Sequence, residues 1–221
     1  MGFPNWAKNI LFLLVYMISG LVLVIIIEGL ISGTDLIPLN TAVEQVMAHL
    51  RTPLMTSLMV LLTKIGNPFA LFCVALFISV LLFIRGKVYE AALFLAVMGL
   101  AVISLTVLKN VFQISRPISE IYQTDGWSFP SGHATLATTF FFMLSYIFIG
   151  HLKTRRGRTC LILGSIAGVF IISFSRLYLG AHWILDVIGG AALGLMSVSF
   201  VVLLFSVFID ENRSVRKRLN M

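Results

Sequence analysis

The sequence is poor in charge. Asp, Glu, Lys and Arg together make up 11% of the 221 residues, whereas 59% are hydrophobic and the mean hydropathy is +1.02. A composition this apolar excludes an ordinary soluble domain and predicts runs long enough to cross a bilayer. Such runs are expected to be helical, because lipid offers the backbone no hydrogen-bond partner.

Cysteine and metal-binding patterns are also scarce. The two cysteines, Cys73 and Cys160, fall in apolar runs near opposite membrane faces, so we expect no disulfide between them. No clustered carboxylates and no Cys/His spacing typical of a metal site occur, and we predict neither a metal nor a cofactor. Repeats, low-complexity segments and linkers are absent too, which favours one domain over 1–221.

Six apolar runs are predicted to span the membrane. They cover 9–31, 68–85, 90–108, 132–151, 159–178 and 184–208. The first is too long for the apolar core of a signal peptide, and no small-residue cleavage site follows it, so we expect it to be retained. The sequence therefore predicts an all-α polytopic membrane protein with six transmembrane helices.

The segment 41–65, between the first two spans, has a different pattern. Its apolar residues share one helical face, and Thr52 followed by Pro53 is typical of an N-cap and a first-turn proline. We expect two short helices that lie in the membrane interface. A further span or a re-entrant segment stays open as the alternative.

Basic residues outnumber acidic ones by 16 to 9 and mostly flank the apolar runs. Orientation in the plasma membrane and contact with anionic lipid explain this better than a nucleic-acid partner. Eleven of the sixteen lie in one set of loops, which the positive-inside rule places in the cytoplasm together with both termini. These eleven are Lys8, Arg85, Lys87, Lys153, Arg155, Arg156, Arg158, Arg213, Arg216, Lys217 and Arg218. The loops 109–131 and 179–184 are then expected to share the outer face.

Six ionisable residues gather at the outer ends of the last four spans. An ionisable group within a membrane helix costs about 2.5–3.5 kcal/mol, and less near the interface. A functional site explains this group better than six separate interfacial anchors. The six are Lys109, Arg116, His133, Arg176, His182 and Asp186.

Their spacing indicates phosphate chemistry. His182 and Asp186 are one helical turn apart, so the carboxylate can hold one imidazole nitrogen and leave the other free to attack. Ser131 and Gly132 precede His133 in a first helical turn, where backbone N–H groups favour an anion. The three cations of the group suit the oxygens of a phosphate.

Three stretches carry a resemblance to a known family. They are KNVFQISRP at 109–117, PSGH at 130–133 and SRLYLGAHWILD at 175–186. In this order they resemble the three-part signature of the type 2 phosphatidic acid phosphatase superfamily. The resemblance implies that His182 attacks phosphorus and forms a phosphohistidine, that Asp186 orients His182, and that His133 protonates the leaving oxygen. The phosphate-binding residues that it implies are Lys109, Arg116, Ser131, Gly132 and Arg176.

The expected function is therefore that of a metal-independent lipid phosphatase acting at the outer face. Undecaprenyl diphosphate, phosphatidylglycerol phosphate and phosphatidic acid are all plausible substrates, and the sequence does not rank them. The sequence does not indicate an oligomeric state. A lipid phosphotransferase with the same phosphohistidine chemistry stays open as the alternative. A transporter or channel is disfavoured, because the ionisable groups cluster at one face instead of lining a path.

Overall fold

The computed structural model describes residues 5–33, 36–122 and 124–211, which fold into α-helices without any strand. The predicted basic tail at 213–218 lies outside the described residues. The elements are α1 (Asn5–Ser32), α2 (Leu36–His49), α3 (Pro53–Ile65), α4 (Pro68–Ile84), α5 (Val88–Phe112), α6 (Gly132–Phe148), the 3₁₀ turn η1 (Ile149–His151), α7 (Arg155–Tyr178) and α8 (Ile184–Glu211).

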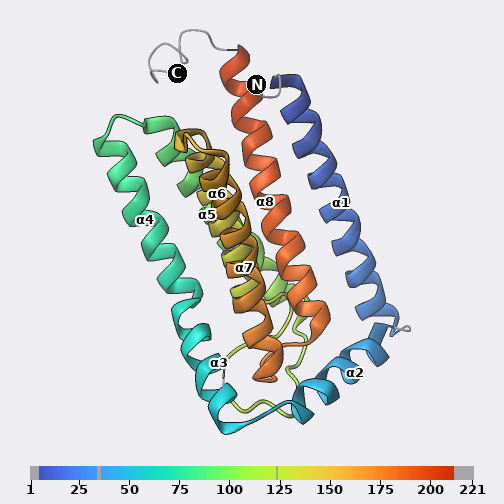
Figure 1. The fold of residues 1–221 in the computed structure, drawn as a ribbon. Helices are drawn as coiled ribbons and strands as arrows, with labels where there is room; N and C mark the ends of the chain where they lie inside the picture. The colour runs from blue at the N-terminus through green and yellow to red at the C-terminus, as the bar shows by residue number, and fades with distance from the viewer. Residues whose placement is uncertain (1–4, 34–35, 123, 212–221) are drawn as a thin grey trace.

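The all-α membrane architecture is confirmed. Helices α1, α5, α6, α7 and α8 are each long and apolar enough to cross a membrane, and α4 makes a sixth span when it is taken together with α3. Every helix that matches a predicted span begins and ends within four residues of the predicted range. The long bundle helices run alongside one another in Figure 1.

The segment between α1 and α4 forms two short helices, as the sequence predicts. The Thr52 hydroxyl accepts the Met55 N–H at 3.4 Å, and Pro53 occupies the first turn of α3. The arrangement differs from two helices lying flat, because the axis of α3 is only 41° from that of α4. Gly66 lies at this bend, where an added Cβ would come within 2.6 Å of Ile172 on α7. The glycine lets the end of α3 approach the bundle.

Helices α6 and α8 form the centre of the bundle. A Cβ at Gly190 would lie 2.6 Å from the Ser131 carbonyl oxygen, and one at Gly194 would lie 2.8 Å from that of Thr135. These two glycines therefore let the backbones of α6 and α8 touch, as small residues do in membrane helix pairs. The contact sets the start of α8 beside the start of α6.

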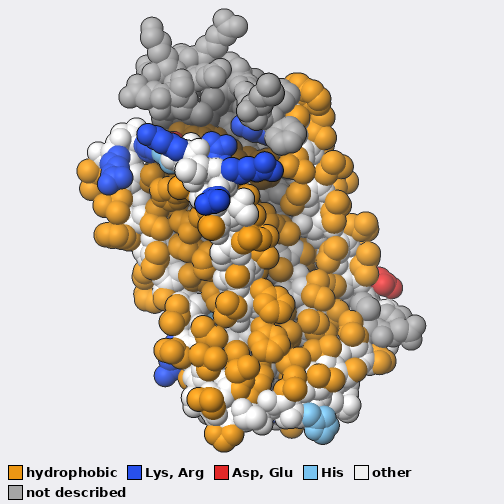
Figure 2. All heavy atoms as spheres, in the orientation of Figure 1, with side chains coloured by type: hydrophobic (Ala, Val, Ile, Leu, Met, Phe, Trp, Pro, Cys, Tyr) orange, Lys and Arg blue, Asp and Glu red, His pale blue; other side chains and the backbone are white. Residues whose placement is uncertain are grey.

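The two ends of the bundle differ in charge. The start of α1, the end of α8 and the α4–α5 and α6–α7 turns lie at one end, whereas α2, α3 and the α7–α8 turn lie at the other (Figure 1). Figure 2 shows most of the visible Lys and Arg side chains at the first end and a broad apolar surface below them. Both cysteines are free and exposed on the sides of the bundle helices. This distribution of charge agrees with the loop pattern read from the sequence.

Candidate active site

Backbone hydrogen bonds bring the α5–α6 loop, the start of α6 and the α7–α8 turn together at the end of the bundle opposite the basic loops. Ile121 N–H donates to the Leu179 carbonyl at 3.1 Å, which joins the α5–α6 loop to the α7–α8 turn. Ser131 N–H donates to the Asp186 carbonyl at 2.9 Å, which joins the start of α6 to the start of α8. The predicted sharing of one face by these two loops is therefore confirmed.

A cavity of about 510 Å³ opens among these segments. Six of the eight predicted site residues line it, whereas Ser131 and Asp186 lie behind its wall. The six are Lys109, Arg116, Gly132, His133, Arg176 and His182. The rest of the wall includes Thr63, Pro68 and Phe69 from α3 and α4, and Leu105 from α5. One cavity is thus lined by both cationic and apolar side chains.

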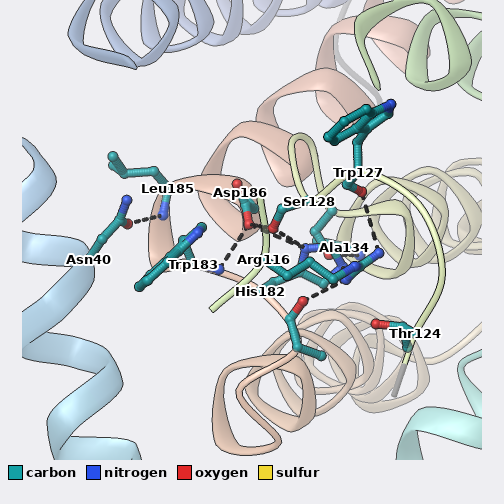
Figure 3. Close-up of polar contacts among 12 residues, drawn as sticks. Asn40, Arg116, Thr124, Trp127, Ser128, Ala134, His182, Trp183, Leu185 and Asp186 are labelled. Atoms are coloured by element: carbon teal, nitrogen blue, oxygen red, sulfur yellow. Dashed lines mark hydrogen bonds and ion pairs between the residues drawn. The ribbon is translucent and has the colours of Figure 1, made fainter. Parts of the chain in front are cut away.

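His182 and Asp186 form a buried pair, in which the two residues are 4% and 0% exposed. The His182 Nδ1 lies 3.3 Å from the Asp186 Oδ2. The same carboxylate oxygen accepts the Trp183 N–H at 2.8 Å and the Ser128 hydroxyl (Figure 3). Three donors therefore converge on one oxygen, and the carboxylate is fixed in orientation.

The contacts of His182 define which ring nitrogen carries the proton. The Arg116 Nη1 lies 3.3 Å from the His182 Nε2, and a guanidinium can only donate, so Nε2 accepts. The Nδ1 then carries the proton and donates it to Asp186. Burial lowers the pKa of His182 well below its usual value, and the charges of Arg176, Arg116 and Lys109 lower it further. The ring is therefore neutral, and its Nε2 lone pair accepts from Arg116 at the wall of the cavity.

Arg116 is held mainly by backbone carbonyls. Its Nε donates to Gly126 O at 2.9 Å and its Nη1 to Ala181 O at 2.6 Å. Its Nη2 donates to Asp125 O and Trp127 O at 3.1 and 3.3 Å. With the His182 contact, all five N–H groups have acceptors. Arg116 brings a positive charge to the cavity while it joins the α5–α6 loop to the α7–α8 turn.

Lys109 and Arg176 make fewer hydrogen bonds to the protein than Arg116 does. Lys109 Nζ donates to the carbonyls of Trp127 and Ser128, the second at 3.4 Å. Arg176 is 1% exposed, and its Nη1 donates to the Thr63 hydroxyl at 2.9 Å. Within the described part of the chain its Nε has no hydrogen-bond partner. Arg176 is therefore the cation with a buried donor available for a bound anion.

The PSGH stretch caps α6. The Ser131 hydroxyl accepts the Ala134 N–H at 3.5 Å, so this side chain satisfies the helix start. Its contact with phosphate stays a prediction. His133 follows in the first turn and lies against α3, where its Nε2 is 3.2 Å from the Thr63 carbonyl oxygen.

Three buried polar residues outside the predicted set also contact the site. Ser128 bonds Asp186, Thr63 contacts both Arg176 and His133, and Asn40 of α2 accepts the Leu185 N–H of α8 at 3.2 Å. Ser128 carries a weak sequence signal, since it lies three residues before Ser131. Thr63 and Asn40 carry none, because a single Thr or Asn in an amphipathic helix is ordinary. Among the residues that the structure describes, no three His, Cys, Asp or Glu side chains are grouped as a metal site requires.

The fold and the site define a class of protein: a polytopic helical membrane enzyme whose buried histidine–carboxylate pair faces a cationic cavity. A family model described as the PAP2 superfamily matches residues 90–210, which is more than half of the chain. The chain therefore belongs to the PAP2 superfamily and is a membrane phosphatase of that family.

Curated relatives support the same assignment. Phosphatidylglycerophosphatase B of Bacillus subtilis (strain 168) is 28% identical over 160 residues, which cover 71% of this chain and 78% of that protein. An undecaprenyl-diphosphatase of Sulfolobus acidocaldarius is 30% identical over 196 residues, which cover 85% and 86%. The two relatives carry the names of different lipid phosphatases, so they do not choose between those substrates for this chain.

Two solved structures share the fold. A transmembrane PAP2 type phosphatidylglycerolphosphate phosphatase from Bacillus subtilis matches with a TM-score of 0.75 and 23% identity, over 90% of this chain and 96% of that one. LpxE of Aquifex aeolicus matches with a TM-score of 0.55 and 29% identity, over 74% and 94%. The first likeness concerns the fold alone.

Proposed function

We propose that this protein hydrolyses lipid phosphates or lipid diphosphates through a phosphohistidine at His182. The observation that carries the proposal is the position of His182, whose Nδ1 contacts Asp186 and whose Nε2 lies beside Arg116 in the wall of a cavity that Lys109 and Arg176 also line. A neutral imidazole is a nucleophile, and an adjacent carboxylate stabilises the positive charge that the ring gains as it attacks.

The reaction proceeds in two steps. In the first, Nε2 of His182 forms a bond to phosphorus, the bond from phosphorus to the leaving oxygen breaks, and the doubly protonated ring of His133 gives that oxygen its Nδ1 proton while its Nε2 proton stays hydrogen-bonded to the Thr63 carbonyl. In the second, water attacks phosphorus, its proton passes to His133, and the bond from phosphorus to Nε2 breaks. In both steps the negative charge on the phosphoryl oxygens is stabilised by the positive charges of Lys109, Arg116 and Arg176. Such stabilisation is the main requirement of phosphoryl transfer.

The composition of the cavity wall supports a lipid as substrate. The reacting phosphate fits the cationic side chains, and Pro68, Phe69 and Leu105 add apolar side chains to the wall. Phe69 is 76% exposed on the side of the bundle, where lipid would surround it. A molecule with a phosphate at one end and a hydrocarbon chain at the other suits both kinds of side chain. Undecaprenyl diphosphate, phosphatidylglycerol phosphate and phosphatidic acid are the classes that we propose.

The distribution of charge supports an orientation with the site outside. The basic loops occupy the end where α1 starts and α8 ends, and the positive-inside rule favours the cytoplasm for this end. The protein would then act from the outer leaflet of the plasma membrane, with its cavity facing the periplasm or the exterior.

The test is phosphate release by purified full-length protein across a panel of lipid mono- and diphosphates, with EDTA present. We expect release that EDTA does not reduce and that His182→Ala abolishes. An added lipid acceptor that takes up the phosphoryl group in place of water would indicate the phosphotransferase instead. Absence of both release and transfer across the panel would refute the proposal.

A further inference from the structure

Thr63 lies outside the three signature stretches and yet contacts two of them. It belongs to the last turn of α3, where its side chain is turned inwards and the residue is 2% exposed. The neighbouring Lys64 and Ile65 are exposed. Thr63 therefore reaches the cavity wall from the segment that joins the first two spans.

The hydroxyl of Thr63 controls the orientation of Arg176. Among the described residues it is the hydrogen-bond partner of this guanidinium, and it accepts from Nη1 at 2.9 Å. The ring of Tyr122 lies on another side, 6.0 Å from Cζ. With Nη1 held in this way, Nε stays buried and without a partner in the described structure. The contact thus fixes which edge of the guanidinium is left for phosphate oxygens.

The carbonyl of Thr63 is free to contact His133 because α3 ends at this point. The last carbonyls of a helix lack partners within it. The Asn67 N–H, which would reach Thr63 O in a continuing helix, donates instead to Lys64 O at 3.3 Å. The bend between α3 and α4 thereby exposes the Thr63 carbonyl, and His133 Nε2 lies 3.2 Å from it. Because a carbonyl oxygen can only accept, the Nε2 of His133 carries a proton on the side of α3, and the acid proton of the proposed reaction is the one on Nδ1.

We propose that Thr63 is a positioning residue of the active site, which orients the guanidinium of Arg176 through its hydroxyl and the ring of His133 through its carbonyl. The expected effect of Thr63 on catalysis rests on the proposed phosphatase function. It also makes α3 a part of the site, although that helix contributes no signature residue.

The key substitution is Thr63→Val, which keeps the shape, the β-branch and the backbone carbonyl but removes the hydroxyl. Thr63→Ser keeps the hydroxyl and serves as the conservative variant. Ser57→Ala is the matched control on α3, since the Ser57 hydroxyl is part of the helix's own surface and donates to Pro53 O, 3.0 Å away. Thermal unfolding of each full-length variant shows whether the fold is kept.

The measurements are kcat and KM for a lipid monophosphate in proteoliposomes and the inhibition constant of inorganic phosphate. A hydrogen bond to a charged group, once lost, lowers an equilibrium or rate constant by about tenfold or more. We expect Thr63→Val to lower kcat/KM by about that factor and to weaken inhibition by phosphate to a similar extent. We expect Thr63→Ser to stay within about threefold of the parent on the same scale, and Ser57→Ala to be unchanged.

Two results would overturn the assignment. One is a Thr63→Val protein with the affinity for inorganic phosphate of the parent. The other is a Thr63→Ser protein as impaired as Thr63→Val, because the hydroxyl would then be irrelevant. If the parent releases no phosphate from any lipid, the proposed function fails, and titration with inorganic phosphate still compares the variants. Weaker phosphate binding by Thr63→Val would support the positioning role in that case, and equal binding would refute it.

Discussion

Replacement of Asp186 by Asn is expected to impair catalysis by removing a charge without changing the tautomer of His182. The oxygen Oδ2 accepts the N–H of Trp183 at 2.8 Å and the hydroxyl of Ser128, whereas Oδ1 has no partner within the described structure. An Asn side chain therefore keeps its carbonyl oxygen at the Oδ2 position and its NH₂ at the Oδ1 position. His182 still finds an acceptor for its Nδ1 proton.

The size of the effect follows from the lost charge. At 3.3 Å from Nδ1, a unit charge interacts with a fully cationic ring by about 5 kcal/mol at an effective dielectric constant of about 20. If about half of the ring's charge has developed in the transition state, the loss is about 2.5 kcal/mol, or roughly 10²-fold in kcat. An amide that inverted the tautomer would cost more, about 10⁴-fold as in a serine-protease triad.

The assay is single-turnover phosphate release from matched mono- and diphosphate lipids by the parent and Asp186→Asn proteins. We expect the same loss of about 10² on both substrates, because His182 is affected before any leaving group matters. Thermal unfolding controls for folding. A rate lowered by about 10⁴, as for an inverted tautomer, or a loss confined to one substrate, would contradict the expectation that the amide oxygen occupies the Oδ2 position.

Three further predictions follow from the same geometry. His133→Ala should lower turnover of a lipid monophosphate by about 10²–10⁴ and that of a diphosphate less, since a phosphate leaves without a proton; equal losses would contradict the acid role. Because burial and nearby cations lower the pKa of His182, phosphoenzyme formation from p-nitrophenyl phosphate should hold steady as pH falls from about 7 through the ordinary histidine value of about 6.5. A fall of the rate to half at about pH 6.5 would instead show that the pKa of His182 is that of an ordinary histidine. In a cysteine-free parent, an impermeant thiol reagent should label Thr124→Cys in intact cells and spare Arg156→Cys, and the reverse pattern would invert the orientation.

The sequence predicts the bundle well because its signals are local. Each span is a long apolar run, and the break before α3 is specified by Thr52 and Pro53, whose side chains act within one turn. The tilt of α3 is different. It depends on the close approach of Gly66 to Ile172 on α7, a contact between segments more than a hundred residues apart. No local pattern encodes that contact, so the amphipathic pattern alone predicts a helix lying flat.

The site divides in the same way. His182 and Asp186 are one turn apart on a helix start, and their contact could be predicted from spacing alone. The hydrogen bonds from Arg116 to backbone carbonyls could not be predicted, because the folded loop places those carbonyls. Thr63 acts partly through its carbonyl, which every residue has, so residue type carries no signal of that contact.

The central claim is that the Nε2 of His182 becomes covalently bound to phosphorus. The most direct measurement is to quench a single turnover of lipid labelled in its phosphate, digest the protein in alkali, where phosphohistidine survives, and identify the modified residue and ring nitrogen. We expect the Nε2-phosphohistidine isomer, mapped to residue 182 and absent from His182→Ala. Phosphate on Nδ1, on another residue, or on the His182→Ala protein would contradict it.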